Sequence, residues 1–407
     1  MTGTCRVTGA QVAPGVLVDL AIVDGRFAAS EAELPGDCAS FDAAGRVVLP
    51  ALVEPHVHLD KTYFPARNED GNLVGAIEAF RKVKDRGRQI EDIEDRAERA
   101  VRRAIANGVG RMRTHIDLGS EQDLIGLEAV RRIRDRYADA IALEIAAMAD
   151  PLENPAAARR MDTALAGGVD LVGGAPALSA DPAASAIALV DRALEAGVGI
   201  DLHADESEDP ESVVLETFAN RILEKGPALY ATASHCCALA FMPREKRLDV
   251  LARVREAGIG IVTLPSCNLV LMGRGMEPAP RGAAPVKDIL ATGVPVGAGS
   301  DNVADPFNPF GSYAPLLTAF VNAQVAQLTA ESELDTALEM VGPMAARALG
   351  HTADVIAPGG AANFAIFDAC TFETLVVDPA PCVATFHRGR LLTRARFDRE
   401  WSFEPAP

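Results

Sequence analysis

Short apolar runs alternate with amphipathic segments along most of the chain. Eight of these runs are bounded by turn residues, and we interpret them as buried strands: 47–53, 111–116, 141–147, 169–173, 199–202, 229–233, 259–264 and 294–298. Between them the pattern predicts helices, several closed by glycine as helix capping favours: 90–107, 121–137, 182–196, 211–225, 244–257 and 286–291. This alternation predicts an α/β fold, and a closed (β/α)8 TIM barrel rather than an open sheet.

The alternation is absent at both ends of the chain. Strand-like runs occupy 4–8, 16–23 and 46–49, and two more lie at 359–368 and 383–392. The simplest arrangement pairs the two groups in one small β-sandwich domain built from both termini. The sequence therefore predicts two domains, a small β domain from residues 1–48 and 352–407 and a barrel from residues 49–351.

Length, charge and cysteine usage narrow the function classes. The 407 residues fit a barrel of about 250 residues plus an accessory domain. A net charge of −18 argues against nucleic acid or an anionic membrane surface as a partner. The chain has no signal-like start and no apolar run of about 18 residues, so we expect a cytoplasmic protein. Seven cysteines without a framework spacing predict no structural disulfides. The predicted helices have Ala-rich outer faces, which would permit the protein to form a homo-oligomer.

Histidine and aspartate residues follow the predicted barrel strands. His56 and His58 come after the first strand, and in an extended chain such side chains project from one face, about 6–7 Å apart. Others follow the second, fifth, sixth and eighth strands: His115, His203, His235 and Asp301. The carboxyl ends of all barrel strands meet at one mouth, so these side chains are expected to converge. Three histidines and one aspartate suit one divalent ion, Zn²⁺ or Fe²⁺, with Mn²⁺ also compatible.

A carboxylate close to one of these histidines is a candidate proton carrier. A divalent ion with an open coordination position lowers the pKa of water to about 7, and the protons released need an acceptor. Glu206 lies three residues after His203, where the chain leaves its strand. The alternative role for Glu206 is a carboxylate at a helix amino terminus, favoured by the helix dipole. Beside a metal-binding histidine, we prefer the catalytic role.

Five sequence blocks carry a resemblance to a known family. They are Glu-Pro-His-Val-His-Leu-Asp-Lys at 54–61, Arg-Thr-His-Ile-Asp at 113–117, Asp-Leu-His-Ala-Asp-Glu at 201–206, Ala-Ser-His-Cys at 233–236 and Gly-Ser-Asp-Asn-Val-x-Asp-Pro-Phe at 299–307. Together they resemble the amidohydrolase superfamily, in its cytosine deaminase-like branch, which also contains N-isopropylammelide amidohydrolases. The resemblance covers nearly the whole chain. It implies a TIM barrel with a small β domain that binds one Zn²⁺ or Fe²⁺.

The resemblance also implies a role for each candidate residue. By it, His235 would polarise the attacking water, Glu206 would protonate a ring nitrogen, and the metal ligands would be His56, His58, His203 and Asp301. Asp301 would also move protons during the reaction. The implied reaction is hydrolytic deamination of an amino-substituted N-heterocycle with release of ammonia. Binuclear relatives carry a bridging lysine on strand four, where this chain has Leu-Val-Gly-Gly-Ala at 171–175, so one metal ion is expected.

One departure from the branch concerns the substrate. Cytosine deaminases have a glutamine just after strand three, whereas this chain has Ala-Met-Ala-Asp-Pro at 147–151, which puts Asp150 in its place. A carboxylate accepts hydrogen bonds and donates none, so it prefers a ring edge richer in N–H groups than cytosine offers. The alternative role for Asp150 is a helix N-cap before Pro151. Asn268 and Phe307 are further expected substrate contacts, and His115 is expected either to touch substrate or to support the metal ligands.

Four kinds of function compete on these observations. We favour a deaminase of a small heterocycle, with the identity of the ring left open. The Leu-Asp-Lys segment at 59–61 also resembles relatives that remove an alkylamine from triazine-like rings, which keeps that reaction as an alternative. Opening of a cyclic amide is disfavoured by the missing strand-four lysine. A catalytically dead scaffold is disfavoured because the chain keeps every expected metal ligand.

Overall fold

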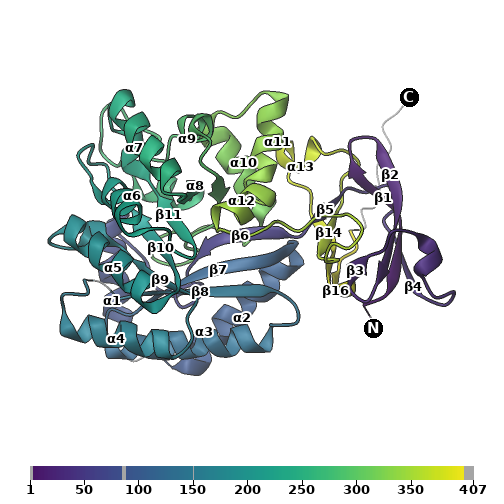
Figure 1. The fold of residues 1–407 in the computed structure, drawn as a ribbon, viewed down its shortest axis with the longest axis horizontal. Helices are drawn as coiled ribbons and strands as arrows, with labels where there is room; N and C mark the ends of the chain where they lie inside the picture. The colour runs from purple at the N-terminus through teal and green to yellow at the C-terminus, as the bar shows by residue number, and fades with distance from the viewer. Residues whose placement is uncertain (1–2, 85–88, 150, 398–407) are drawn as a thin grey trace.

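The computed structural model describes residues 3–84, 89–149 and 151–397, and its main feature is a barrel of parallel strands (Figure 1). Eight strands form one sheet in which each lies beside the next in chain order. They are β6 (Leu52–Val57), β7 (Val109–Asp117), β8 (Ala142–Met148), β9 (Leu171–Gly174), β10 (Gly199–Ala204), β11 (Ala231–His235), β12 (Gly260–Thr263) and β13 (Val296–Ala298). A parallel bridge between Val57 and Asp301 joins the first strand to the chain just after the last, which closes the sheet. The predicted α/β fold with a TIM barrel is confirmed.

Helices surround the barrel, and Figure 1 shows α2 to α5 packed along its outer side. In the described part of the chain they are α1 (Leu73–Lys84), α2 (Ile90–Ala106), α3 (Leu124–Arg136), α4 (Pro155–Ala166), α5 (Pro182–Ala196), α6 (Val214–Lys225), α7 (Arg244–Glu256), α8 (Pro265–Leu271), α9 (Val286–Thr292), α10 (Pro315–Ala326), α11 (Glu331–Glu339), α12 (Pro343–Ala348) and α13 (Thr374–Val377). Every residue of β6, β10 and β12 is buried. One face of each strand fills the barrel and the other packs against helices, which explains the continuous apolar runs.

The first predicted strand, 47–53, is wrong in its extent, because the chain changes sheets within it. β5 (Val48–Pro50) pairs with a strand near the carboxyl terminus, and only from Leu52 does the chain enter the barrel as β6. Pro50 has no backbone N–H, so it suits the end of a ladder and not its middle. β6 also ends later than predicted, at Val57, so His56 lies within the strand instead of after it.

Both ends of the chain form small sheets beside the barrel, with strand orders β3-β2-β1-β4 and β16-β15-β14-β5. Their strands are β1 (Cys5–Ala13), β2 (Val16–Val23), β3 (Arg26–Phe27), β4 (Ala39–Asp42), β5, β14 (Phe364–Phe367), β15 (Cys382–His387) and β16 (Arg390–Arg394). One apolar core joins the two ends, with Val7 and Phe27 beside Phe364 and Phe386, whose rings stack at 4.4 Å. The expected small β domain from both termini is confirmed. Its boundaries, 1–48 and 352–407 against 49–351, stay a prediction.

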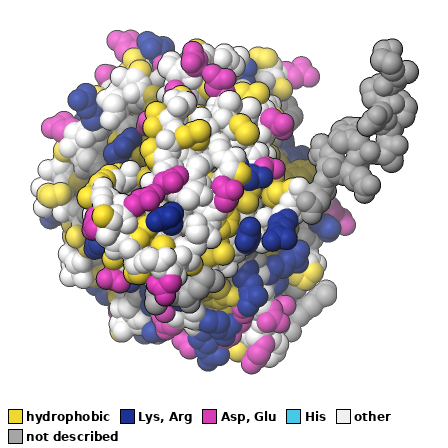
Figure 2. All heavy atoms as spheres, turned by 90° about the vertical axis from the view of Figure 1, so that its right-hand side faces the viewer, with side chains coloured by type: hydrophobic (Ala, Val, Ile, Leu, Met, Phe, Trp, Pro, Cys, Tyr) yellow, Lys and Arg dark blue, Asp and Glu magenta, His cyan; other side chains and the backbone are white. Residues whose placement is uncertain are grey.

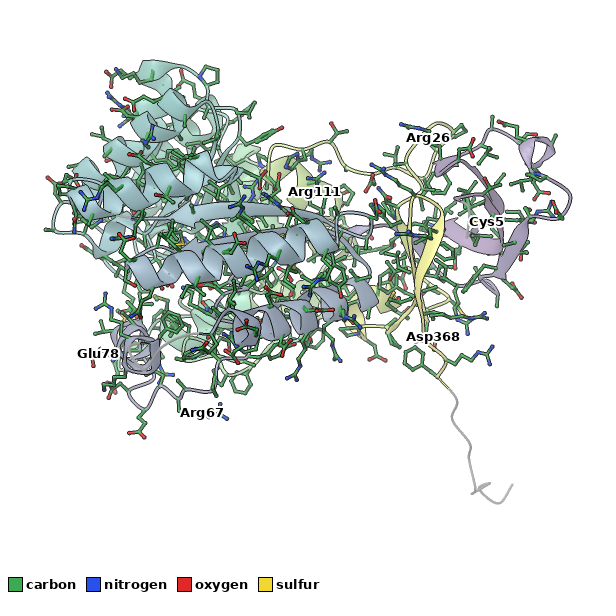
Figure 3. All side chains as sticks on the ribbon, turned by 90° about the horizontal axis from the view of Figure 1, so that it is seen from below. Cys5, Arg26, Arg67, Glu78, Arg111 and Asp368 are labelled. Atoms are coloured by element: carbon green, nitrogen blue, oxygen red, sulfur yellow. The ribbon has the colours of Figure 1, made fainter. Side chains whose placement is uncertain are left out.

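The mouth of the barrel lies at the end of the molecule away from the small domain. In Figure 3, Arg67 and Glu78, from the segment that follows β6, lie far from Cys5 and Arg26 of the small domain. The end that carries the small domain has mixed charge, since Figure 2 shows Lys and Arg side chains gathered beside Asp and Glu side chains. Over the described residues, no helix has both the length and the apolar character needed to cross a membrane.

Candidate metal centre and active site

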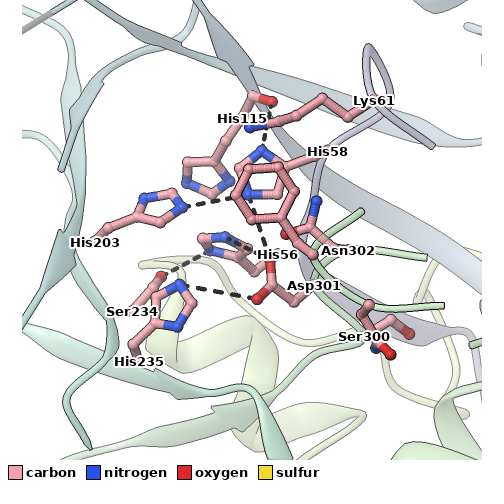
Figure 4. Close-up of polar contacts among 12 residues, drawn as sticks. His56, His58, Lys61, His115, His203, Ser234, His235, Ser300, Asp301 and Asn302 are labelled. Carbon is pink, nitrogen blue, oxygen red and sulfur yellow. Dashed lines mark hydrogen bonds and ion pairs between the residues drawn. The ribbon is translucent and has the colours of Figure 1, made fainter. Parts of the chain in front are cut away.

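Three barrel strands bring the four predicted metal ligands together at the mouth (Figure 4). His56 lies in β6, His58 follows it, His203 lies in β10, and Asp301 follows β13. His58 Nε2 is 3.3 Å from His203 Nε2 and 3.3 Å from Asp301 Oδ1. His56 Nε2 is 3.6 Å from the same Asp301 oxygen. All four side chains are almost completely buried.

These distances fit one divalent ion. Bonds of about 2.0–2.1 Å in tetrahedral geometry put the ligand atoms roughly 3.3–3.4 Å apart, close to the three separations found here. His56, His58 and Asp301 form one group whose ligand atoms all lie within 4.8 Å of one another, and His56 with His203 and His235 forms another. His56 Nε2 is buried and makes no hydrogen bond to any described residue, as expected of an atom whose partner is a metal ion.

The histidines are neutral and suitably oriented for metal binding. Burial lowers the pKa of His56, His58 and His203 well below 6.5, so their rings are unprotonated at neutral pH. His58 Nδ1 lies 3.1 Å from the backbone oxygen of His115. A carbonyl oxygen only accepts, so His58 carries its proton on Nδ1 and keeps the Nε2 lone pair for the metal.

A third group of potential ligands, His56, His115 and Asp201, does not make a second metal site. Asp201 is already paired with the buried Arg113, whose Nη1 lies 2.9 Å from Oδ2. Burial alone would raise the pKa of Asp201, but His115 and Arg113 bring it below its usual value. The Asp201 carboxylate therefore already has its counter-charge, and the single metal ion expected from the sequence stays a prediction.

Glu206 and His235 lie next to each other at the edge of this cluster. Glu206 Oε1 lies 3.4 Å from His235 Nδ1, and the Glu206 side chain is only 11% exposed. Burial, helped by the charge of Asp301, raises the pKa of Glu206 well above 4.5 and so favours its protonated form. Asn268, which is fully buried, has its amide nitrogen 3.0 Å from His235 Nδ1 and donates to it. The proton of the His235 ring is then on Nε2, which lies 3.9 Å from Asp301 Oδ2.

One cavity opens onto these groups. Its lining contains six predicted site residues, His58, His203, Glu206, His235, Asp301 and Phe307, together with Lys61, Leu73, Ile77, Asp117, Met148, Ala175, Leu178 and Asn302. Lys61 was not among the predicted site residues, although it is the last residue of the block at 54–61. Its ammonium group donates to both oxygens of Asp117 at 2.9 Å and lies 5.0 Å from the centre of the Phe307 ring.

Two of the other predicted substrate contacts, His115 and Asn268, do not line this cavity. His115 is fully buried and stacks on His56 with ring centres 3.8 Å apart. Asp150 lies outside the described residues. The substrate roles of all three stay predictions. A larger cavity of about 560 Å³ lies in the small domain, but none of the predicted site residues lines it.

Residues 65–393 match the family model described as the amidohydrolase family. The chain belongs to that family. Among curated proteins it is 32% identical to the pterin deaminase of Rhizobium rhizogenes, over 89% of this chain and 84% of that one. An amidohydrolase of this kind is a hydrolase of C–N bonds, which confirms the predicted class of enzyme.

Two solved structures of amidohydrolases resemble the fold closely. The 5-methylcytosine deaminase of Klebsiella pneumoniae, liganded with 5-fluorocytosine, is 27% identical, with a TM-score of 0.89 over 97% of this chain and 99% of that one. The N-isopropylammelide isopropylaminohydrolase of Burkholderia multivorans is 28% identical, with a TM-score of 0.84 over the same shares of the two chains. The resemblance to the deaminase and N-isopropylammelide amidohydrolase branch is thereby confirmed.

Proposed function

We propose that this amidohydrolase is a mononuclear metal-dependent deaminase that hydrolyses the exocyclic amine of a small amino-substituted N-heterocycle. The observation that carries the proposal is the joint lining of one cavity by three of the four proposed ligands and by Glu206 and His235; the three ligands are His58, His203 and Asp301. The likeness to a pterin deaminase and to a 5-methylcytosine deaminase supports an aminated ring as the substrate class.

The proposed metal ligands are His56, His58, His203 and Asp301. A divalent ion, Zn²⁺ or Fe²⁺, supplies a lowered pKa for water at neutral pH and a Lewis acid beside the ring. The neutral Nε2 atoms and the Asp301 carboxylate meet the need of such an ion for unprotonated ligands.

In this proposal Glu206 and Asp301 divide the proton transfers. Glu206, whose protonated form is favoured by burial, gives its proton to the ring nitrogen next to the carbon under attack. Asp301 takes one proton from the attacking water and passes it to the departing amine, which leaves as ammonia. The water oxygen stays on the ring carbon as a carbonyl, and its second proton returns to Glu206. His235, positioned by Asn268, donates from Nε2 to the attacking water.

Removal of an alkylamine is the second candidate reaction. It is favoured by the likeness to the N-isopropylammelide isopropylaminohydrolase, which matches 97% of the chain. The same residues would act in the same roles, and only the group that leaves the ring would differ. The two reactions are therefore separated by the product and not by the site.

The test is product release from a panel of rings by the zinc- or iron-loaded protein. The panel contains pterins, aminopyrimidines, aminotriazines, creatinine-like rings and an N-alkylated triazine, with ammonia and alkylamine measured separately. Asp301→Asn should lower the rate by at least the roughly 10²–10⁴-fold typical of an acid–base group. Asp335→Asn, on the exposed side of α11, is the matched control and should leave the rate unchanged. Absence of either product from the whole panel with metal bound would refute the proposal.

A further inference from the structure

A chain of fully buried polar side chains leads from the barrel interior to the candidate metal centre. Arg113 Nη1, in β7, lies 2.9 Å from Asp201 Oδ2, in β10. Asp201 Oδ1 lies 3.0 Å from Ser234 Oγ, in β11, and that oxygen lies 2.9 Å from His56 Nδ1, in β6. Each of these four residues has no exposed surface, so solvent is not in contact with any of them.

The charge of Arg113 fixes the direction of every hydrogen bond in this chain. A guanidinium only donates, so Asp201 stays a carboxylate and only accepts. The Ser234 hydroxyl has a single hydrogen and donates it to Asp201. Its oxygen must then accept from His56, whose ring proton is on Nδ1. The lone pair of His56 Nε2 is thereby left for the metal ion.

A second ring, that of His115, lies between Asp201 and His56. His115 Nε2 is 3.3 Å from Asp201 Oδ1. The His115 ring stacks on the His56 ring, with centres 3.8 Å apart and planes 23° apart. The Asp201 carboxylate is therefore connected to His56 Nδ1 through Ser234, and the His115 ring beside it covers one face of His56.

We propose that Asp201, anchored by Arg113, is a positioning residue that fixes the tautomer and orientation of the metal ligand His56 through Ser234. The inference rests on the proposed metal centre but not on the proposed reaction. Partners of this kind behind metal-binding histidines typically change metal affinity about 10–100-fold when removed. Here the Asp201 carboxylate acts on His56 through the hydroxyl group of Ser234.

The test compares two deletions of a single buried hydroxyl group. Ser234→Ala removes the acceptor of the His56 proton. Thr263→Val, in the neighbouring strand β12, removes a buried hydroxyl that makes no hydrogen bond to the described residues. The dissociation constant for Zn²⁺ is measured by competition with a chromophoric chelator, in the full chain and without any substrate. Long-range proton–nitrogen NMR of histidine-labelled, metal-free protein reports which nitrogen of His56 carries the proton.

We expect Ser234→Ala to weaken zinc binding about 10–100-fold and to lose the Nδ1–H form of His56, with Thr263→Val unchanged in both measurements. Equal zinc affinity in Ser234→Ala and wild type would overturn the inference, and so would a wild-type His56 protonated on Nε2. A wild-type protein that binds no zinc would overturn the metal centre and this inference together. A wild type that binds zinc but releases no ammonia would refute only the proposed reaction.

Discussion

Replacing Glu144 by glutamine should destabilise the barrel, and the loss should depend on pH. Glu144 lies in β8, where Oε2 accepts from Arg113 Nε at 3.2 Å and Oε1 lies 2.5 Å from His351 Nε2. It thus ties a barrel strand to the buried arginine and to the chain that follows α12. A glutamine at this position would keep the shape of the side chain but not the charge that Arg113 requires.

The magnitude follows from the pKa of Glu144. Burial alone would raise that pKa, but Arg113 and His351 outweigh it and lower the value from 4.5 to about 2. At 1.36 kcal/mol per pKa unit, this difference corresponds to about 3 kcal/mol of folding stability. The unfolded chain takes up the proton first as the pH falls. The stabilisation is therefore complete above pH 4.5 and is lost as the pH falls from 4.5 towards 2.

The assay is urea unfolding of wild type and Glu144→Gln at pH 7, 4 and 3. The protein is first stripped of metal with a chelator, because acid also releases metal from its ligands and would add a second pH dependence. Glu333→Gln is the control, since the pKa of Glu333 is also lowered to about 2 but the group lies on the surface, at the start of α11. It should cost clearly less than Glu144→Gln. An equal free energy of unfolding for Glu144→Gln and wild type at pH 7, or a difference that does not shrink at pH 3, would refute the reasoning.

Three further outcomes are expected. A Cβ on Gly260 in β12 would overlap the backbone oxygen of Ala348, so Gly260→Ala should lower the free energy of unfolding by at least about 1–3 kcal/mol. Gly36 has open space around it, so Gly36→Ala should change the free energy of unfolding little in the same urea titration. Because burial raises the pKa of Glu206 and favours its protonated form, deamination should decline as the pH rises through that pKa. Glu206→Gln should be roughly 10²–10⁴-fold slower and lack this decline in a pH profile of kcat/KM. Iodoacetamide on the native protein should label the exposed Cys370 in mass spectra and leave the five buried cysteines unmodified until urea is added.

The sequence predicted the residues at the strand ends well, because the barrel converts a position in the sequence into a position in space. His203 in β10 and His235 at the end of β11 follow apolar runs that are evident in the sequence itself. Once eight strands close in order, their carboxyl ends share one mouth. The same logic failed at 47–53, since an apolar run does not reveal that it divides between two sheets at Ala51.

The polar interior of the barrel could not be predicted in the same way. Arg113 lies in a strand whose neighbours are buried, yet it is fully buried itself and pairs with Glu144 and Asp201, which are 31 and 88 residues away. Nothing local to Arg113 distinguishes it from a charged residue at the surface. Such a charge is tolerated only where counter-charges from other strands meet it, and this depends on the register of the whole sheet.

Three residues at the mouth of the barrel adopt a backbone conformation that is unfavourable for residues other than glycine. Asp205, His235 and Asp301 have φ values of 53°, 69° and 60°, a region that residues other than glycine adopt at a cost of order 1–3 kcal/mol each. The conformation is held by contacts across the barrel, since Asp301 N donates to His56 O at 2.9 Å and Ala238 N donates to Asp205 O at 3.1 Å. Glycine would adopt these angles without strain but would carry no imidazole or carboxylate. At His235 and Asp301 this cost in stability places an imidazole and a carboxylate in the cavity of the candidate site. At Asp205 it places a carboxylate that accepts from the backbone N–H groups of Val214 and Leu215, at the start of α6.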